Sequence, residues 1–266
     1  MVSTCCRCAL ACSVAASLAA VPAQAQDLGS SIVEQSAAQA AQQNPFPSKQ
    51  KSIFSGLFDD FRAIPTRDNL IIAGIGGLAA GLAHPADGRV SRTLSGSARM
   101  GSTLGPGEVL GGAAAQMVGS IATHAIGRAI GSPKVSAIGA DLVRAQIVTQ
   151  TMTFGIKMAA QRTRPDGTQY SFPSGHTSTT FATATVLQRH LGWKAGVPAY
   201  AFATYVAASR VQAKRHFLSD VAMGATIGIV AGRSVTLGRG DARFALAPSA
   251  VPGGAGVSFT WLGGKQ

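Results

Sequence analysis

A histidine and an aspartate near the carboxyl end of the chain have the residue types that nucleophilic catalysis requires. His216 and Asp220 lie four positions apart, which places both on one face at the start of a helix predicted over 217–232. A carboxylate can hold one imidazole nitrogen protonated and leave the other free as a nucleophile or base. Arg210, which follows Ser209, could clamp an oxyanion from the neighbouring turn. Taken alone, a histidine and an aspartate at this spacing usually form an ordinary helix pair.

A second cluster joins a histidine to a turn that could bind an anion. The sequence Pro173-Ser174-Gly175-His176 precedes a helix predicted to begin at Thr177. Free backbone N–H groups at a helix N-terminus attract anions, and a glycine lets a ligand approach the backbone closely. His176 would then lie beside the bound anion. Ser174 could equally be a helix cap with no further role.

A third cluster is a pair of cations. Lys157 and Arg164 are seven positions apart, or two helical turns, so both side chains should leave one face of a single helix. A compact ammonium and a bidentate guanidinium together suit phosphate oxygens. Two cations at helical spacing are, however, more often a solvated surface.

Taken together, the three clusters resemble the signature of the type 2 phosphatidic acid phosphatase (PAP2) superfamily, which includes bacterial acid phosphatases and vanadium haloperoxidases. The signature is a lysine, six residues and Arg-Pro, then Pro-Ser-Gly-His, then Ser-Arg, five residues, a histidine, three residues and an aspartate. Residues 157–220 match it at every fixed position. Only 166–172 separate the first two motifs, which is shorter than the insert of soluble class A acid phosphatases and argues against that subgroup.

The resemblance implies a metal-independent phosphatase that works through a phosphohistidine. His216 would attack phosphorus in line, Asp220 would orient His216, and His176 would protonate the leaving oxygen and later deprotonate water. The resemblance implies no cofactor and predicts that vanadate inhibits. The phosphate oxygens would be held by basic and polar residues, namely Lys157, Arg164, Ser174, Gly175 and Arg210.

The substrate stays open at this point. The basic, glycine- and alanine-rich composition favours a lipid phosphate or diphosphate, and the alternative is a broad-specificity periplasmic acid phosphatase acting on small soluble esters. A vanadate-dependent haloperoxidase would use the same pocket, but 266 residues are few for that family. A non-catalytic anion-binding protein would not need the acid–base pair. The sequence decides neither the leaving group nor the oligomeric state.

The elements that must position these residues are predicted to be helices. Aromatic residues make up 6% of the chain, and its 32 glycines favour helices packed closely through small side chains. The fold class is therefore all-α, a helical bundle of the PAP2/acid phosphatase type over 51–236, with a small C-terminal β-hairpin in 237–266. A long loop is expected at 85–108, which holds five glycines and two prolines. Helices are expected over 51–62, 70–83, 109–130, 135–162, 177–190, 196–211 and 217–232.

The hairpin prediction rests on alternating apolar residues in the tail. Phe244 and Leu246 alternate with small residues, as do Phe259 and Trp261, on either side of a Pro-Gly-Gly turn at 252–254. We expect the hairpin to cover the bundle, because a lone hairpin in a membrane would leave open strand edges.

The amino terminus has the features of a secretory signal. All four cysteines lie within the first twelve residues, and an apolar stretch from Ala9 to Ala20 leads to an Ala-Gln-Ala cleavage site that ends at Ala25. Residues 1–25 are thus a predicted signal peptide and 26–50 a flexible leader. An uncleaved anchor helix, or a lipoprotein attached through Cys12, are the alternatives. The predicted location is periplasmic or envelope-associated.

The charge balance narrows the class of partner. The formal net charge is +12, from 23 basic and 11 acidic residues, which suits an anionic substrate or an anionic membrane surface. Nucleic acid is excluded as a partner by the compartment and by the lack of basic runs interleaved with aromatics. Asp141 and Arg144 interrupt the apolar runs, so none reaches about 20 residues without a charge. This pattern favours a soluble or peripheral bundle over an integral one.

Six further residues near or outside the motifs have less specific predictions. Three basic ones, Arg162, Lys214 and Arg215, fit either the steering of anions or exposed solubilising charge. The three histidines outside the motifs, His84, His124 and His190, are predicted to be structural.

Overall fold

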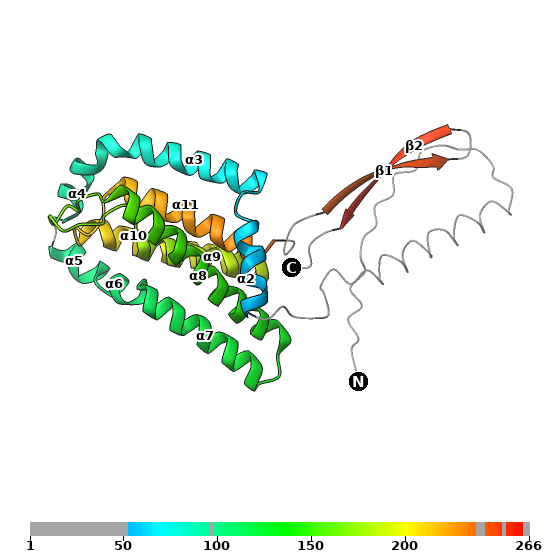
Figure 1. Ribbon diagram of the computed structural model, residues 1–266, viewed down its shortest axis with the longest axis horizontal. Coiled ribbons are helices and arrows are strands. Elements are labelled where there is room, and N and C mark those ends of the chain that lie inside the picture. The colour runs from blue at the N-terminus through cyan, green and yellow to red at the C-terminus, as the bar shows by residue number, and fades with distance from the viewer. Residues whose placement is uncertain (1–52, 96–97, 238–242, 252–253, 263–266) are drawn as a thin grey trace, which may run out of the picture. The chain divides into compact units, whose positions relative to one another are not determined.

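The computed structural model describes residues 53–95, 98–237, 243–251 and 254–262 (Figure 1). The predicted signal peptide at 1–25 and leader at 26–50 lie outside the described residues. The helices of the bundle, in chain order, are α2 (Ile53–Arg62), α3 (Arg67–Ala83), the 3-10 turn η1 (His84–Ala86), α4 (Asp87–Ser95), α5 (Ala98–Leu104), α6 (Pro106–Leu110), α7 (Ala113–Ala129), α8 (Pro133–Ala160), α9 (Gly175–Leu191), α10 (Trp193–Gln212) and α11 (Leu218–Val235).

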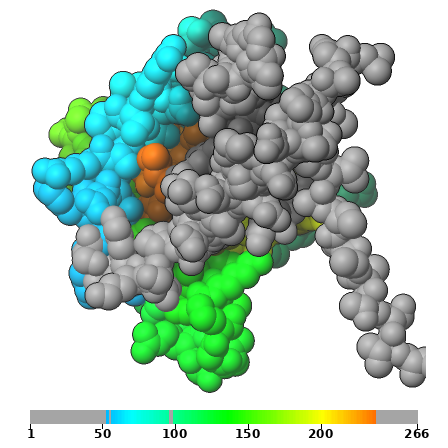
Figure 2. All heavy atoms as spheres, turned by 90° about the vertical axis from the view of Figure 1, so that its right-hand side faces the viewer, coloured from blue at the N-terminus to red at the C-terminus, as the bar shows by residue number. Residues whose placement is uncertain are grey.

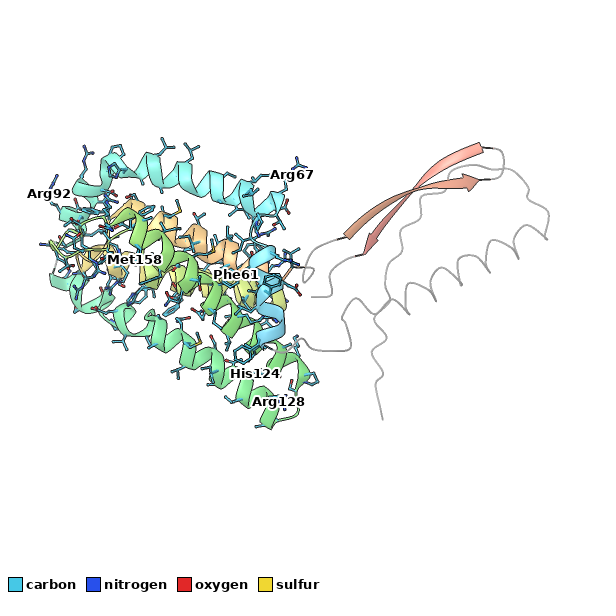
Figure 3. The ribbon with its side chains drawn as sticks, in the orientation of Figure 1. Phe61, Arg67, Arg92, His124, Arg128 and Met158 are labelled. Atoms are coloured by element: carbon cyan, nitrogen blue, oxygen red, sulfur yellow. The ribbon has the colours of Figure 1, made fainter. Side chains whose placement is uncertain are left out.

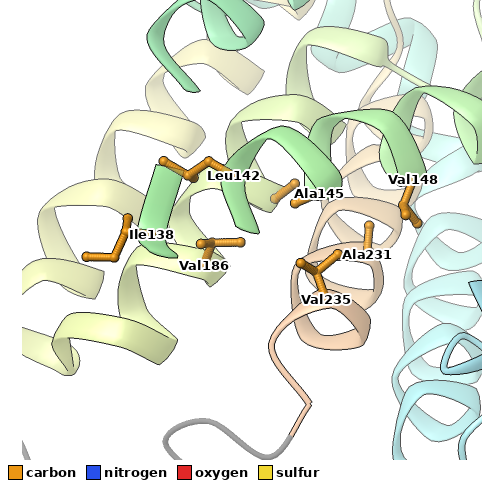
Figure 4. Close-up of a cluster of buried hydrophobic side chains, with 8 residues drawn as sticks. Ile138, Leu142, Ala145, Val148, Val186, Ala231 and Val235 are labelled. Atoms are coloured by element: carbon orange, nitrogen blue, oxygen red, sulfur yellow. The ribbon is translucent and has the colours of Figure 1, made fainter. Parts of the chain in front are cut away.

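The core lies among α8, α9 and α11, with α3 and α7 on the outside. In Figure 1, α3 runs along one side of the bundle and α7 along the other, with α8 to α11 between them. Helix α3 packs against α11, and α7 packs against α8. Viewed from the end of the bundle (Figure 2), the cyan α3 and the green segment that joins α7 to α8 lie on opposite sides of the orange α11. The central buried side chains are alanine and branched aliphatic residues and are drawn in Figure 4: Ile138, Leu142, Ala145, Val148, Ala182, Val186, Ala231 and Val235.

A stripe of glycines on α11 allows that helix to touch the backbone of α9. A Cβ atom on Gly224 would lie 2.6 Å from the carbonyl oxygen of Ser174, and one on Gly228 would lie 2.3 Å from that of Ser178. Such distances are shorter than any stable contact, so only glycine fits at these positions. The close approach fixes the N-terminus of α9 beside the N-terminus of α11, and both ends carry motif residues.

The described residues of the segment predicted as a loop, 85–95 and 98–108, are mainly helical, so that prediction is wrong. They contain η1, α4, α5 and most of α6. The prolines that suggested a loop stand at helix starts, Pro85 in η1 and Pro106 at the first position of α6, where a missing N–H has no cost. The predicted helix over 109–130 is likewise divided, because α6 ends at Leu110 and α7 begins at Ala113.

The tail forms the predicted pair of strands, β1 (Arg243–Val251) and β2 (Gly254–Leu262). They are antiparallel, with Phe244 opposite Trp261 and Leu246 opposite Phe259. The centre of the predicted turn, 252–253, lies outside the described residues. Packing of this hairpin on the bundle stays a prediction.

The outer faces of α3 and α7 carry many exposed apolar side chains. Leu78 and Leu82 of α3 are 65% and 73% exposed, and Val118 of α7 is 66% exposed. By length and composition, the described residues contain one helical stretch able to cross a membrane, Arg67–Ser95, and a second if the bent pair Arg99–Leu110 and Ala113–Ala129 forms one span. In Figure 3, Arg67 and Arg92 lie at opposite ends of the first of these stretches.

This surface argues against the soluble bundle that the charge pattern favoured. The two charges that interrupt the apolar runs face the interior: Arg144 Nε lies 2.7 Å from the Asp60 carboxylate, and Arg144 Nη2 lies 2.9 Å from Asp141. Both partners are buried with the arginine. Charges that are paired inside a bundle leave its outer surface apolar.

Candidate functional site

The three motifs meet at the end of the bundle where α9 and α11 begin and α10 ends. Two backbone hydrogen bonds hold the second and third motifs there: the Ser174 N–H donates to the Asp220 carbonyl (3.0 Å), and the His216 N–H donates to the Arg210 carbonyl (3.2 Å). The first bond ties the start of α9 to α11, and the second ties His216 to the end of α10. Segments that are far apart in the sequence therefore meet at one place.

His216 has its two ring nitrogens in different surroundings. Its Nδ1 lies 2.6 Å from the carbonyl oxygen of Ser171, which can only accept, so Nδ1 carries the proton and Nε2 carries the lone pair. The side chain is buried. Burial and the positive charges of Lys157 and Arg164 lower the pKa of His216, whereas Asp220 opposes the shift. A neutral imidazole with a fixed tautomer is the form that can act as a nucleophile.

Asp220 lies next to His216 but does not hold it directly. The distance from its Oδ2 to His216 Nδ1 is 3.7 Å, too long for a hydrogen bond. Asp220 accepts instead from the Ser171 hydroxyl and from the Phe217 N–H at 2.8 Å. Burial would raise the pKa of Asp220, but the hydrogen bonds outweigh this effect and hold that pKa below its ordinary value. Asp220 therefore positions Ser171, whose carbonyl in turn fixes His216.

The shared helix face predicted for His216 and Asp220 is wrong. His216 precedes α11, which begins at Leu218 with Phe217 as its N-terminal cap residue, and Asp220 is the third residue of that helix. The two side chains still come together, because the 213–217 turn folds back onto the end of α10.

The shared helix face predicted for Lys157 and Arg164 is also wrong. Helix α8 ends at Ala160, and Gln161 takes a left-handed conformation with φ of 44°, so Arg164 lies in the following loop. That loop folds back, and the Lys157 Nζ donates to the Tyr170 carbonyl at 2.7 Å. Burial, followed by the charge of Arg164, lowers the pKa of Lys157 to about 8. The two cations are thus neighbours because the loop after α8 folds back, and not because they share a helix face.

Two arginines present buried donors at the site. Within the described residues, Arg164 Nε and the Nε and Nη1 of Arg210 are buried and make no hydrogen bond. The nearest acidic group to Arg210 is Glu108 of α6, whose Oε1 lies 3.4 Å from Nη1. Buried cationic donors are costly when they lack an acceptor, so they suit a site that takes an anion.

His176 is the second residue of α9, which begins at Gly175, two residues before the predicted start at Thr177. Its Nε2 donates to the Glu108 carbonyl at 3.0 Å. Burial and the charge of Arg210 lower the pKa of His176 to about 4. Ser174 is the N-cap residue of α9, but its hydroxyl makes no capping hydrogen bond and accepts from the Thr177 hydroxyl at 3.0 Å. The backbone N–H groups of Gly175 and His176 lie in that first turn, where N–H groups have no helical partner.

Comparison with known proteins places this arrangement in a family. The sequence pattern of the PAP2 superfamily matches residues 138–243, which contain every motif residue. This part of the chain therefore carries the sequence pattern of the PAP2 superfamily. The match begins in α8, so it includes the four helices that carry the site and leaves α3 and α7 outside.

Three known proteins are similar to parts of the chain. It is 38% identical over 100 residues to the lipid A 1-phosphatase of Porphyromonas gingivalis (36% of this chain and 21% of that protein). It is 30% identical over 99 residues to the lipid A 4'-phosphatase of Helicobacter pylori (33% and 50%). The chain spans half or less of the length of these relatives. The crystal structure of a transmembrane PAP2-type phosphatidylglycerolphosphate phosphatase from Bacillus subtilis superposes with a TM-score of 0.50 at 20% identity, covering 67% of this chain and 94% of that one. This likeness confirms the helical PAP2-type fold.

Residues without a predicted role in the site hold the start of α11 in place behind Asp220. Arg162 Nη1 donates to Asp220 at 2.7 Å, and Nη2 donates to Asp87 of α4 at 2.8 Å. Asp87 in turn accepts from the backbone N–H of Ser219 at 2.9 Å. Arg162 therefore ties α4 to the start of α11 and is neither a steering nor a solubilising charge. Only its place between Lys157 and Arg164 could have suggested a role.

The remaining basic residues and histidines near the PAP2 site have structural contacts. Arg215 pairs with Asp166 at 3.0 Å within the loops, and Lys214 is exposed. His190 Nε2 lies 2.7 Å from Asp141, and His124 Nδ1 lies 2.9 Å from the Ser136 carbonyl. These contacts agree with structural roles. His84 differs, because its Nδ1 pairs with Asp87 at 3.2 Å and so lies at the edge of the support around Arg162.

Over the part of the chain that the structure describes, histidine, cysteine, aspartate and glutamate side chains do not gather in any group of three or more that could hold a metal ion.

Proposed function

We propose that the chain is a phosphatase that hydrolyses phosphate monoesters of lipids through a phosphohistidine, without a metal ion. The observation that carries the proposal is the gathering of Lys157, Arg164 and Arg210 around His216 and His176, whose pKa values are both lowered by burial and by these positive charges. Cations that surround one phosphoryl group supply the charge stabilisation that a metal supplies elsewhere. The names of the relatives, two lipid A phosphatases, support a lipid phosphate as the substrate class.

The first chemical step uses both histidines. The Nε2 lone pair of His216 attacks phosphorus in line, the phosphorus–oxygen bond to the leaving group breaks, and His176 gives its proton to the leaving oxygen. Ser171 and Asp220 keep His216 in the tautomer that can attack. A bound phosphate dianion favours the protonated form of His176 and thus offsets the low pKa of that residue in the free site.

The second step releases phosphate. His176 takes a proton from water as the water oxygen attacks the phosphohistidine, and His216 leaves as a neutral imidazole. Throughout both steps, the phosphate oxygens contact the three cations and the backbone N–H groups at the start of α9. Ser174 lies at that start as the N-cap residue.

The exposed apolar faces support a membrane location for the active chain. Helices α3 and α7 expose rows of leucine, isoleucine and valine, and a lipid phosphate reaches its hydrolase at a membrane surface. The predicted signal at 1–25 supports export, with the site in the periplasm or envelope. A membrane-associated, exported phosphatase agrees with all of these features.

A substrate panel in detergent tests the proposed function. We expect release of phosphate from lipid A and phosphatidate at higher kcat/KM than from p-nitrophenyl phosphate or nucleotides. EDTA should leave the rate unchanged, and vanadate should compete with substrate because it mimics the phosphoryl transition state. Loss of activity in EDTA would contradict the metal-free mechanism. Preference for small soluble esters would contradict the lipid substrate, and bromide oxidation with peroxide and vanadate would instead support a haloperoxidase.

The alkaline side of the pH profile should report on Lys157. We expect kcat/KM to fall as pH rises through about 8, because the lysine loses its proton near that pH and with it one contact to phosphate. The Lys157→Arg variant keeps its charge and should lose this fall up to about pH 10. Lys194→Arg, at an exposed position of α10, is the matched control and should retain it. An unchanged alkaline fall in Lys157→Arg would assign it to another group.

A further inference from the structure

Glu108 of α6 contacts two residues of the proposed mechanism. Its carboxylate Oε1 lies 3.4 Å from Arg210 Nη1, and its backbone carbonyl accepts from His176 Nε2 at 3.0 Å. The Glu108 side chain is 52% exposed, whereas that of Arg210 is 4% exposed. A carboxylate therefore stands at the mouth of the site, half in solvent, against a buried cation. The PAP2 motifs do not include this position.

The backbone that carries Glu108 is held in place by the packing of α6 on α10. A Cβ atom on Gly107 would lie 2.7 Å from Ser209 Oγ, and one on Gly111 would lie 2.3 Å from Val206 Cγ1. Glu108 stands between these two glycines, so on both sides of it the α6 backbone packs directly against side chains of α10. The Tyr205 hydroxyl adds a hydrogen bond at 2.8 Å to the Thr103 carbonyl, just before α6. Movement of Glu108 away from the site would break this packing.

The leaving group must pass this carboxylate. In the proposed mechanism the leaving oxygen receives its proton from His176, on the side of phosphorus opposite to His216. The ring of His176 lies against the Glu108 backbone. The part of the substrate that follows the leaving oxygen therefore extends along α6, where the Glu108 side chain faces solvent.

We infer that Glu108 selects the leaving group of the substrate. Its carboxylate repels a leaving group that carries negative charge, such as the lipid monophosphate that leaves when the terminal phosphorus of a lipid diphosphate is attacked, and accepts hydrogen bonds from a leaving group that carries free hydroxyls, such as a sugar. The preferred substrates are then phosphate monoesters of glycolipids rather than lipid diphosphates. This inference rests on the proposed function and narrows its substrate class.

Three lipids measured in the same detergent test the inference. The reference is phosphatidate, whose diacylglycerol leaving group is neutral and has no free hydroxyl before cleavage. A monophosphorylated glucosamine lipid supplies the hydroxyls, and an isoprenyl diphosphate supplies the charge. In Glu108→Gln, kcat/KM for the diphosphate relative to phosphatidate should rise about tenfold, because like-charge repulsion is removed. The value for the glucosamine lipid relative to phosphatidate should fall about threefold, because a neutral amide accepts more weakly.

Dividing each kcat/KM by the value for phosphatidate separates selection of the leaving group from general effects of the substitution. Any disturbance of Arg210 or His176 would affect all three substrates alike and cancel in these ratios. Asp68→Asn is the matched control: Asp68 is an exposed carboxylate of α3 that faces Arg233 at 3.5 Å, and its loss should leave both ratios unchanged. Glu108→Asp keeps the charge and should keep the low diphosphate ratio. Helical circular dichroism verifies the fold of each variant.

Two outcomes would overturn the inference. In the first, both kcat/KM ratios of Glu108→Gln lie within twofold of those of the parent. In the second, the parent protein itself prefers the diphosphate to both monoesters. Failure of the parent to hydrolyse any of the three lipids would contradict the proposed function instead, so the two failures are distinguishable.

Discussion

Replacement of His216 by alanine is expected to lower kcat for p-nitrophenyl phosphate by about ten-thousandfold or more, because the variant has no nucleophile to form the covalent intermediate. The p-nitrophenyl ester is the sharpest substrate for this test, since its leaving group needs no proton and the loss then reports on the nucleophile alone. Turnover is measured by nitrophenolate absorbance in detergent.

His124→Ala is the control for the His216 variant. His124 of α7 contacts the Ser136 carbonyl in the first turn of α8, outside the site, and its loss should leave kcat within a few-fold of the parent. The parent protein, quenched during turnover, should also contain phosphate bound in an acid-labile form, as a phosphohistidine is. A His216→Ala variant that retains a near-normal rate would assign the nucleophile to another residue.

Replacement of His176 by asparagine should have an effect that depends on the leaving group. For an alkyl phosphate such as phosphatidate, we expect kcat/KM to fall about a thousandfold, because an alkoxide cannot leave without a proton. For p-nitrophenyl phosphate the fall should be about tenfold or less, since nitrophenolate is stable without protonation. The ratio kcat/KM is the correct measure, because it excludes the later hydrolysis of the intermediate.

One outcome would contradict the role of His176 as a general acid. Equal losses on the two substrates would mean that His176 positions phosphate and does not protonate the leaving oxygen. Steady-state rates of the parent and the variant on both esters, measured in one detergent at one pH, decide between these roles. Circular dichroism confirms that the variant keeps its helical content.

The motif residues could be predicted from the sequence, whereas the contacts that hold them could not. Ser171 and Asp87 have no distinctive sequence pattern, and they matter because loops far apart in the chain meet at Asp220 and Arg162. The order of the motifs indicates which side chains share an anion. It does not indicate that a backbone carbonyl, rather than the Asp220 carboxylate, accepts the hydrogen bond from His216 Nδ1.

Proline and glycine, the residues that usually mark loops and helix ends, gave wrong predictions for two segments. Proline and glycine suggested a loop at 85–108, but Pro85 and Pro106 stand at helix starts and Gly107 gives α6 a close fit on α10. At the end of α8, by contrast, the helix stops where no residue signalled a stop. Gln161 takes a left-handed conformation without being glycine or asparagine, so no residue type marked the end of the helix before Arg164.

The positions of charged residues in the sequence also did not show whether their side chains face solvent or the interior. Asp141 and Arg144 break the apolar pattern of their helix, which favoured a water-soluble bundle. Their side chains lie inside the bundle and pair with Asp60 and His190. A pattern along one helix does not reveal which neighbours satisfy its charges, so the apolar exterior emerged only from the structure.

One oxygen atom links two parts of the mechanism. The Arg210 carbonyl accepts from the backbone N–H groups of both Arg215 (3.0 Å) and His216 (3.2 Å), which closes the five intervening residues into a turn of fixed length. Insertion or deletion of a residue between 210 and 216 would rotate the attacking imidazole away from the guanidinium that holds its target. Variation in chain length among relatives should therefore fall in the 166–172 connection or outside the motifs, and circular permutants should be opened elsewhere.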